Sequence, residues 1–287
     1  MLSGFYLNGQ FNKPYEISED PVIRNIPAFV FAVVGSALAL SPARAADLEP
    51  VPASGEWTFT IAPYLWAAGL SGDIGLFGRE PVEVDMSFSD ILDDLKFAGM
   101  VVSEAHNGSF GVFTDISYVK TKADESIRRD VLGVPAELSA SVETDSFAAT
   151  LMGEFRIVDE ENMSLDVMAG GRLWSVSNDI SAQLQAGGAE LAEFSGDDGD
   201  TWVDPMVGAK TRIDTGSPLY FTAWGMIGGF GVSSDLAWDV MGGVGYQWSD
   251  WFSTVAGYRA LGVDYENDGF VYDVVQQGFF LGGVMRF

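Results

Sequence analysis

Apolar and polar residues alternate over long stretches of the chain after residue 56. In the segment 235–248, for example, Leu236, Trp238 and Val240 share one parity, whereas Asp239 and Met241 share the other. A period of two is the signature of a β-strand. These segments are longer than the roughly 5–6 residues of an average strand, and they suit a tilted transmembrane strand of about 9–11 residues. The pattern predicts strands near 57–70, 96–106, 109–121, 138–157, 163–177, 201–213, 218–231, 235–248, 251–263 and 271–287.

Short and long connections alternate between these segments. Short turns are expected at 107–109, 159–162, 215–218 and 249–250, and mostly long, acidic loops at 71–95, 122–137, 178–200 and 264–270, with a short exception at 232–234. Short periplasmic turns and longer outer loops are typical of outer-membrane barrels. The fold class predicted is therefore all-β: a transmembrane antiparallel up-and-down β-barrel of about ten strands, with both termini on the periplasmic side. Eight or twelve strands are alternatives, because 73–76 with 82–88 and 180–185 with 190–194 could form extra hairpins or outward extensions of the strands.

The last strand carries the most specific single signal. The chain ends GFFLGGVMRF, an apolar alternating segment whose final residue is aromatic. Chain ends of soluble domains usually fray, whereas a barrel must pair its last strand with its first. This segment resembles the sorting signal of outer-membrane barrel proteins, which would consist of Phe279, Leu281, Met285 and Phe287.

In each strand, the residues that alternate with the apolar ones argue for lipid rather than water around the barrel. It is rich in Gly, Met and Ala with scattered charges, which suits a narrow lumen better than a solvated face. Aromatic residues gather where segments meet short turns, and they are expected to form an interfacial girdle: Trp57, Phe110, Tyr220, Trp248, Trp251, Phe252 and Phe287. A soluble, lipocalin-like secreted binding barrel is the alternative fold.

The N-terminal region reads as an export signal. Residues 27–40 form an uncharged apolar run that is too short for a spanning helix. Ala43 and Ala45 give a small-x-small cleavage signature before Ala46. We therefore expect a signal peptide at 1–45 with an atypically long n-region, a short periplasmic lead at 46–56, and a barrel domain at 57–287.

Composition narrows the classes of function. The chain has a net charge of −26 with a mean hydropathy of +0.15. This charge argues against nucleic acid as a partner, because such binding depends on Lys and Arg neutralising phosphates. Because there is no Cys, disulfides and thiol chemistry are excluded, and a single His removes most His-dependent catalysis.

Charged residues on lumen positions are the best functional clue. Acids and bases there nearly balance, and buried charges in a narrow barrel must pair. A packed, salt-bridged lumen is favoured over a narrow selective pore. The predicted lumen charge network is Asp115, Glu154, Arg156, Asp166, Arg172, Asp204, Lys210, Arg212, Asp239, Arg259 and Arg286.

The remaining motifs give little evidence for a catalytic or metal site. A short helix at 90–95, capped by Ser89 or Asp90, could lie over the barrel mouth as a plug or pack as an ordinary loop helix. The acidic runs lack EF-hand spacing, and His106 beside the turn at 107–108 is interpreted as a turn residue. We expect no catalytic residue, metal or cofactor, and hence no enzyme.

Three segments together carry a family resemblance. PYLWAAGLSGDIG (63–75), VDMSFSDILDDLKFAGM (84–100) and GYRALGVDYENDGFVYDV (257–274) resemble an uncharacterised family of Gram-negative outer-membrane β-barrels. The resemblance spans most of 57–287, although Ala67 and Ala68 depart from the family pattern after PYLW. It implies a barrel in the cell outer membrane and no catalytic residues. The predicted function is a structural or weakly pore-forming barrel, with a small-solute channel, a lipid-modifying enzyme and a soluble secreted binding barrel as alternatives. Expected partners are membrane lipid, lipopolysaccharide and the barrel-assembly machinery, with a small solute in the channel alternative.

Overall fold

A computed structural model describes residues 55–287 apart from 132–133 and 188. The predicted signal peptide, its cleavage site between Ala45 and Ala46, and most of the lead at 46–56 lie outside the described residues. The described part of the chain is almost entirely β-strand, with one short helix.

The elements follow one another as a meander. Their bounds are β1 (Thr58–Gly75), β2 (Val82–Met86), α3 (Phe88–Asp94), β3 (Leu95–His106), β4 (Phe110–Val131), β5 (Val134–Glu160), β6 (Met163–Ala186), β7 (Ala189–Asp214), β8 (Leu219–Gly229), β9 (Leu236–Gln247), β10 (Phe252–Asn267) and β11 (Phe270–Arg286).

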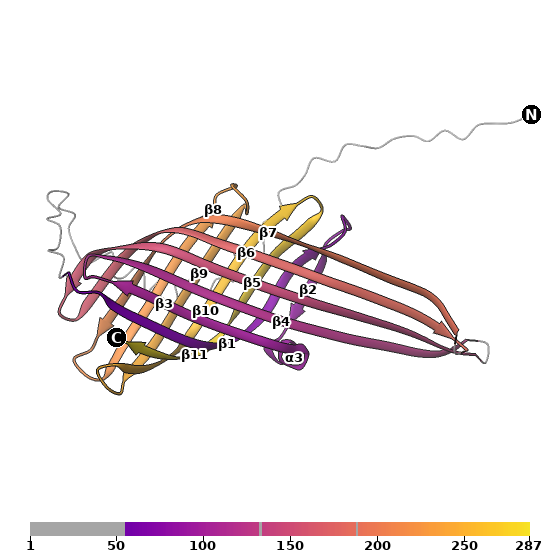
Figure 1. Ribbon diagram of the computed structural model, residues 1–287, viewed down its shortest axis with the longest axis horizontal. Coiled ribbons are helices and arrows are strands. Elements are labelled where there is room, and N and C mark those ends of the chain that lie inside the picture. The colour runs from indigo at the N-terminus through magenta and orange to yellow at the C-terminus, as the bar shows by residue number, and fades with distance from the viewer. Residues whose placement is uncertain (1–54, 132–133, 188) are drawn as a thin grey trace, which may run out of the picture. The chain divides into compact units, whose positions relative to one another are not determined.

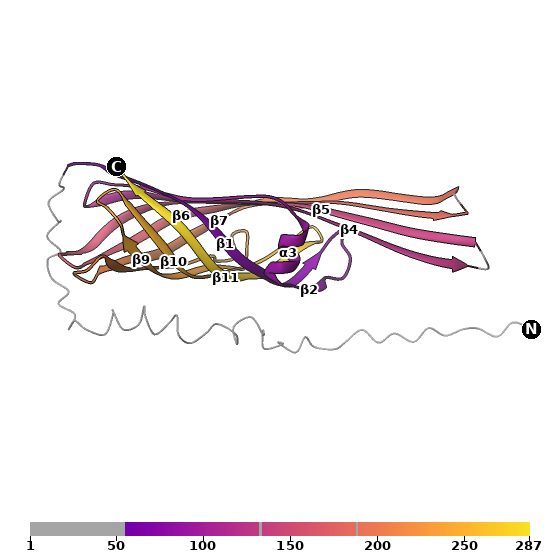
Figure 2. The same cartoon turned by 90° about the horizontal axis from the view of Figure 1, so that it is seen from below.

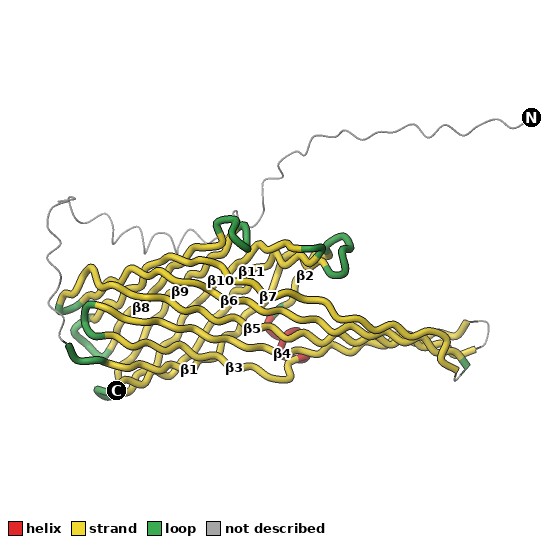
Figure 3. Tube along the Cα trace, turned by 45° about the horizontal axis from the view of Figure 1, so that its top comes forward, coloured by secondary structure: helices red, strands yellow, loops and turns green. Residues whose placement is uncertain are grey.

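The sheet closes on itself. It has 11 strands in the order β11-β10-β9-β8-β7-β6-β5-β4-β3-β1-β2, and an additional antiparallel pairing joins β11 to β1. Among the described strands, β2 pairs only with β1, so the other ten form the ring (Figures 1 and 3). Closure leaves no unpaired first or last strand, which an open sheet could not tolerate in lipid. The predicted antiparallel barrel is confirmed.

The two ends of the barrel differ. The start of β1, the end of β11 and the turns between β3 and β4, β5 and β6, β7 and β8, and β9 and β10 share one end, which we call the terminal end. The other end, the loop end, carries α3 and β2. Strands β4 to β7 continue beyond the rest of the barrel at the loop end, as Figures 1 and 2 show.

These long strands correct the predicted loops. The segments expected as loops at 122–137 and 178–200 are mostly paired strand: β4 and β5 stay in register up to Val131 opposite Val134, and β6 and β7 up to Ala186 opposite Ala189. Their many charged residues suggested loops. A strand with water on both faces, however, does not need apolar residues at every second position. Of the two open alternatives, 180–185 with 190–194 extends the strands, whereas 73–74 with 82–83 forms a hairpin between β1 and β2.

A two-residue turn replaces the loop expected at 264–270. Strands β10 and β11 pair up to Asn267 opposite Phe270, so only Asp268 and Gly269 connect them. Both have positive φ, 47° and 86°. Positive φ at both central residues is the type I′ hairpin geometry, which favours Asp-Gly.

The helix in the first outer connection starts earlier than predicted. Ser87, rather than Ser89 or Asp90, is the N-cap of α3, and its side chain and Asp90 form a capping box. Asp90 Oδ2 accepts from the Ser87 backbone N–H at 2.9 Å, and the Asp90 N–H donates to Ser87 Oγ at 3.3 Å. These bonds stabilise the first turn of α3, which lies beside β1 at the loop end (Figure 2).

Candidate functional site: charged and aromatic layers across the lumen

The predicted lumen charges divide into separate groups instead of one network. Most are buried, with Asp239 and Asp204 fully covered and Arg172 only 1% exposed. Along the barrel from the terminal end they fall into an inner layer, a central layer and an isolated carboxylate near the loop end. Inward-facing positions recur every second residue along a strand and therefore lie at successive heights in the barrel. Residues at one height come from different strands.

The central layer spans the lumen. Arg259 on β10 places Nη2 2.5 Å from Asp115 Oδ2 on β4 and 2.6 Å from Asp239 Oδ2 on β9. Arg172 on β6 places Nη2 2.5 Å from the same Asp239 oxygen. The Arg259–Asp115 and Arg172–Asp239 pairs join strands that are not neighbours in the ring, so they cross the lumen, whereas the Arg259–Asp239 pair joins the neighbouring strands β10 and β9.

Neutral side chains complete the central layer, and the sequence prediction missed them. Tyr64 Oη accepts from Arg259 Nη1 at 2.7 Å and donates to Asp115 Oδ1 at 2.8 Å. Thr150 accepts from Arg172 Nε at 2.7 Å, and Trp224 Nε1 donates to Asp239 at 3.0 Å. The prediction considered charge alone, although strand parity also directs Tyr64 and Trp224 inward.

Aromatic rings surround the central guanidinium. The Arg259 carbon Cζ lies 5.0 Å from the Trp66 ring centre and 5.3 Å from that of Trp224. Cation–π attraction strengthens when the cation is desolvated. Arg259 is therefore held by ion pairs in the plane of its head group and by rings beside it.

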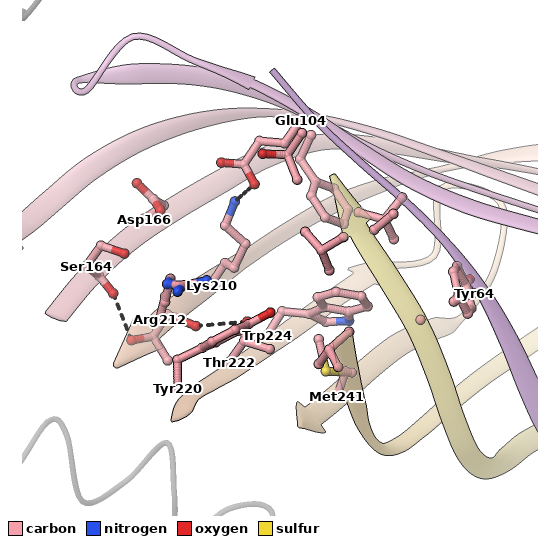
Figure 4. A pocket seen from close by; sticks show the side chains of 18 of the residues that line it. Tyr64, Glu104, Ser164, Asp166, Lys210, Arg212, Tyr220, Thr222, Trp224 and Met241 are labelled. Atoms are coloured by element: carbon pink, nitrogen blue, oxygen red, sulfur yellow. Dashed lines mark hydrogen bonds and ion pairs between the residues drawn. The ribbon is translucent and has the colours of Figure 1, made fainter. Parts of the chain in front are cut away.

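The inner layer lies nearer the terminal end. Lys210 Nζ is 2.7 Å from Glu104 and 2.6 Å from Glu154, and Arg156 Nε is 2.9 Å from Asp166. Glu104 was absent from the predicted set, although it shares the inward parity of its strand. Figure 4 shows Lys210 reaching Glu104 across this part of the lumen.

A cavity of about 200 Å³ occupies the lumen on the terminal-end side of the central layer, and residues of both the central layer (Arg259) and the inner layer (Lys210) line it. Arg212 and Arg286 line it but belong to neither layer. Arg212 pairs with Asp214 at 2.8 Å and lies 3.6 Å from the centre of the Tyr220 ring, whereas Arg286 is exposed. Tyr220, expected in the outer girdle, instead points inward and is only 3% exposed.

His106 lies where the sequence suggested, at the turn. Its Nδ1 accepts from the Gly108 N–H at 2.9 Å. Its Nε2 is also 3.4 Å from Asp166, so the ring joins the turn to the inner layer.

Asp204 is the isolated carboxylate near the loop end. It forms no ion pair with any described basic residue; it accepts from the Ser234 N–H at 2.8 Å, from Ser234 Oγ at 2.7 Å and from Trp202 Nε1 at 3.2 Å. Trp202 stacks on Tyr265, with ring centres 3.9 Å apart and planes at 3°, and Trp174 lies 5.9 Å from Trp202. An aromatic layer thus lies above the central layer.

The outward face of the ring is apolar. Leu65 is 74% exposed, Phe279 72% and Leu151 59%, and similar side chains recur on most strands. A continuous apolar surface of this kind exceeds the patches of a soluble monomer. Trp57, Trp248 and Trp251 are exposed at the terminal end, as the girdle prediction required.

The residues predicted as a sorting signal share this outward face. Phe279, Leu281 and Phe287 are exposed, and Met285 is half-buried and pairs with Ile61 of β1. The C-terminal residue is itself tied to the first strand, because its N–H donates to Phe59 O at 2.8 Å.

Within residues 55–131, 134–187 and 189–287, no helix is long and apolar enough to cross a membrane. No group of three or more His, Asp or Glu side chains in those ranges is arranged to hold a metal ion.

Comparison with known proteins shows the fold. The outer-membrane protease OmpT of Escherichia coli superposes with a TM-score of 0.52 at 9% identity, over 84% of this chain and 100% of OmpT. The chain has the outer-membrane β-barrel fold. The translocator domain of the autotransporter NalP from Neisseria meningitidis gives a TM-score of 0.40 at 12% identity, covering 93% and 97% of the two chains, and Ail of Yersinia pestis gives 0.28 at 15%, covering 81% and 99%.

The sequence comparisons add no family. No protein-family model and no curated protein sequence matches the chain. The motifs in 63–75, 84–100 and 257–274 therefore remain a resemblance, and barrels of the same fold include at least one protease.

Proposed function

We propose that this chain is an integral outer-membrane barrel whose lumen is closed, so that it serves as a structural, non-conducting barrel. The observation that carries the proposal is the central layer, in which Arg259 reaches Asp115 across the lumen and Arg172 and Arg259 share Asp239. A channel needs a continuous opening along the lumen, and ion pairs across the lumen at one level oppose such an opening.

The outward surface supports a membrane location. The apolar face of the ring would contact lipid, the Trp-lined terminal end would lie at the periplasmic interface, and the loop end would lie outside. In this orientation residues 1–45 act as the export signal, cleaved between Ala45 and Ala46. The acidic loop end would then lie beside lipopolysaccharide, and the strand ending at Phe287 would be the segment that assembly machinery binds.

The energetics of the central layer support closure. Removing one partner from a buried ion pair costs about 3–5 kcal/mol, because the other charge is left without compensation. Each ion of the central layer also has a neutral hydrogen-bond partner, such as Tyr64 for Arg259. A passing solute would have to displace these bonds together, so thermal opening of the layer is rare.

The location is tested by cell fractionation and gel migration. We expect the protein in the outer-membrane fraction, with migration that changes on heating because a folded barrel resists detergent. Recovery as a free periplasmic protein would exclude the proposal and favour the soluble binding barrel.

Closure is tested by planar-bilayer conductance. We expect no steady current steps from the wild-type protein and a small leak from the double variant Arg172→Ala/Arg259→Ala, because the unpaired carboxylates draw water into the lumen. Lys122→Ala, outside the central layer, is the matched control and should stay silent. Steady wild-type steps that change with Arg259→Ala would establish a small-solute channel instead.

A further inference from the structure

A second cavity lies in the lumen on the loop-end side of the central layer. This outer cavity has a volume of about 180 Å³. Leu70, Met100, Val119 and Leu261 contribute to its walls, and Ile91 of α3 faces it from the mouth. Its lining is chiefly apolar, whereas charged residues such as Lys210 and Arg212 line the cavity of about 200 Å³ on the other side of the central layer.

One polar group of the lining has no partner. Trp174 lines the outer cavity and is only 2% exposed, and its Nε1–H has no hydrogen-bond partner among the described residues. Four other polar side chains of the lining are paired: Thr144 bonds to Asn178 at 2.9 Å, and Gln276 bonds to Tyr272 at 3.4 Å. Buried donors are rarely left unsatisfied in native structures, and an acceptor on a ligand in the outer cavity would satisfy this one.

The size of the outer cavity limits what it can hold. An apolar cavity of about 150 Å³ stays dry and accommodates benzene. A volume of about 180 Å³ therefore suits one substituted ring. A long acyl chain is too large for this cavity, and a sugar is too polar for its lining.

The wall of the outer cavity is incomplete between β1 and β3. Their register runs from Thr58 opposite His106 only to Pro63 opposite Val101. Beyond that point β1 pairs with β2 instead, and α3 fills the interval between β2 and β3. Figure 2 shows α3 at this position. A seven-residue helix with no buried residue opens more readily than a paired strand, so a ligand would enter the outer cavity here.

We propose that the outer cavity is a binding site for a small apolar molecule, about the size of a substituted benzene, that carries one hydrogen-bond acceptor for Trp174 Nε1–H. This activity goes beyond that of a structural barrel, and it does not require a conducting lumen.

The test uses two fluorinated probes of similar shape and the folded protein in lipid nanodiscs. The first, 4-fluoroacetophenone, carries a carbonyl acceptor, and the second, 1-ethyl-4-fluorobenzene, does not. Fluorine NMR measures the affinity of each probe. We expect the ketone to bind several-fold tighter, up to about tenfold, which is the range of one net hydrogen bond.

Variants separate site binding from partition into lipid. Ser117→Phe places a ring in the outer cavity and should abolish binding of both probes. Ile116→Phe is the matched control, because the adjacent side chain is on the outward face, and it should bind both probes as the wild type does. Trp174→Phe should remove only the preference for the ketone.

Each variant is first checked for heat-modifiable migration, which reports folding. If Ser117→Phe does not fold, Ala68→Leu replaces it, since Ala68 also lines the outer cavity. The proposal is overturned if a folded cavity-filling variant binds the probes as the wild type does. It is equally overturned if the ketone shows no preference in the wild type, or keeps its preference in Trp174→Phe.

Discussion

Charged side chains are buried and paired in the central layer, whereas they are largely exposed in the strands beyond the barrel. We call the strand segments 122–131, 134–145, 177–186 and 189–200 the outer extension. In the central layer Asp239 is fully buried and shared by two arginines. In the outer extension the Arg128–Glu137 pair has side chains 76% and 32% exposed, and every charged residue from 177 to 200 is acidic. The same strands therefore run from balanced, buried charge to exposed, unbalanced charge.

The difference follows from the surroundings of each charge. A buried ion must be paired, because its desolvation penalty is several kcal/mol, whereas an exposed ion is stabilised by water. This contrast explains why a net charge of −26 coexists with a neutralised lumen. It also explains why the net charge predicts nothing about a pore.

The largest effect is expected from Asp239→Asn. The substitution leaves Arg172 and Arg259 without their shared carboxylate, so we expect a loss of about 3–5 kcal/mol in the free energy of unfolding. Urea-induced unfolding in detergent, followed by Trp fluorescence, measures this loss.

Asp124→Asn is the matched control in the outer extension. Its carboxylate is 63% exposed and lies 3.8 Å from Lys122, and the substitution is expected to leave the unfolding midpoint unchanged. Similar losses in the two variants would contradict the distinction drawn between the two regions.

A smaller, local effect is expected from Ser87→Ala, which removes the N-cap side chain of α3. Loss of the N-cap typically costs about 1 kcal/mol, or about fivefold in a local opening equilibrium. The Ile91 N–H, which donates to Ser87 O at 3.1 Å, should exchange with solvent about fivefold faster by NMR. The hydrogen bonds from Ser87 lower the pKa of Asp90, so this pKa should rise toward its ordinary value in Ser87→Ala. An unchanged Asp90 pKa would show that the capping box does not form in solution.

The smallest effect is expected from Glu137→Gln in the outer extension. Hydrogen bonding from Arg128 lowers the pKa of Glu137, so the pair contributes above the usual carboxyl pKa of about 4.3. Its contribution is lost as the pH falls through the lowered value. Because the pair is exposed, solvent screens it, and we expect unfolding curves of the variant and wild type to coincide at pH 7. A clear separation at pH 7 that disappears at acid pH would mean that the outer extension stabilises the barrel.

The alternation of residues by itself determined the fold. Period-two segments and the apolar strand ending at Phe287 predicted an antiparallel barrel, since each inward position is two residues from the next. Parity also placed Asp115, Arg172 and Asp239 on the lumen side. It gave the wrong ends for β4 to β7, because strands exposed on both faces carry no apolar parity to follow.

Only the tertiary structure decided which charges meet. The pairing of Arg259 with Asp115, and the recruitment of Tyr64 to both, depends on how a ring of strands places residues far apart in the chain at one height. Likewise, parity could not show that Asp204 lacks a basic partner among the described residues or that Trp174 borders the outer cavity. A strand pattern fixes the face on which a side chain lies, but depth and neighbours across the lumen follow from the register and closure of the whole sheet.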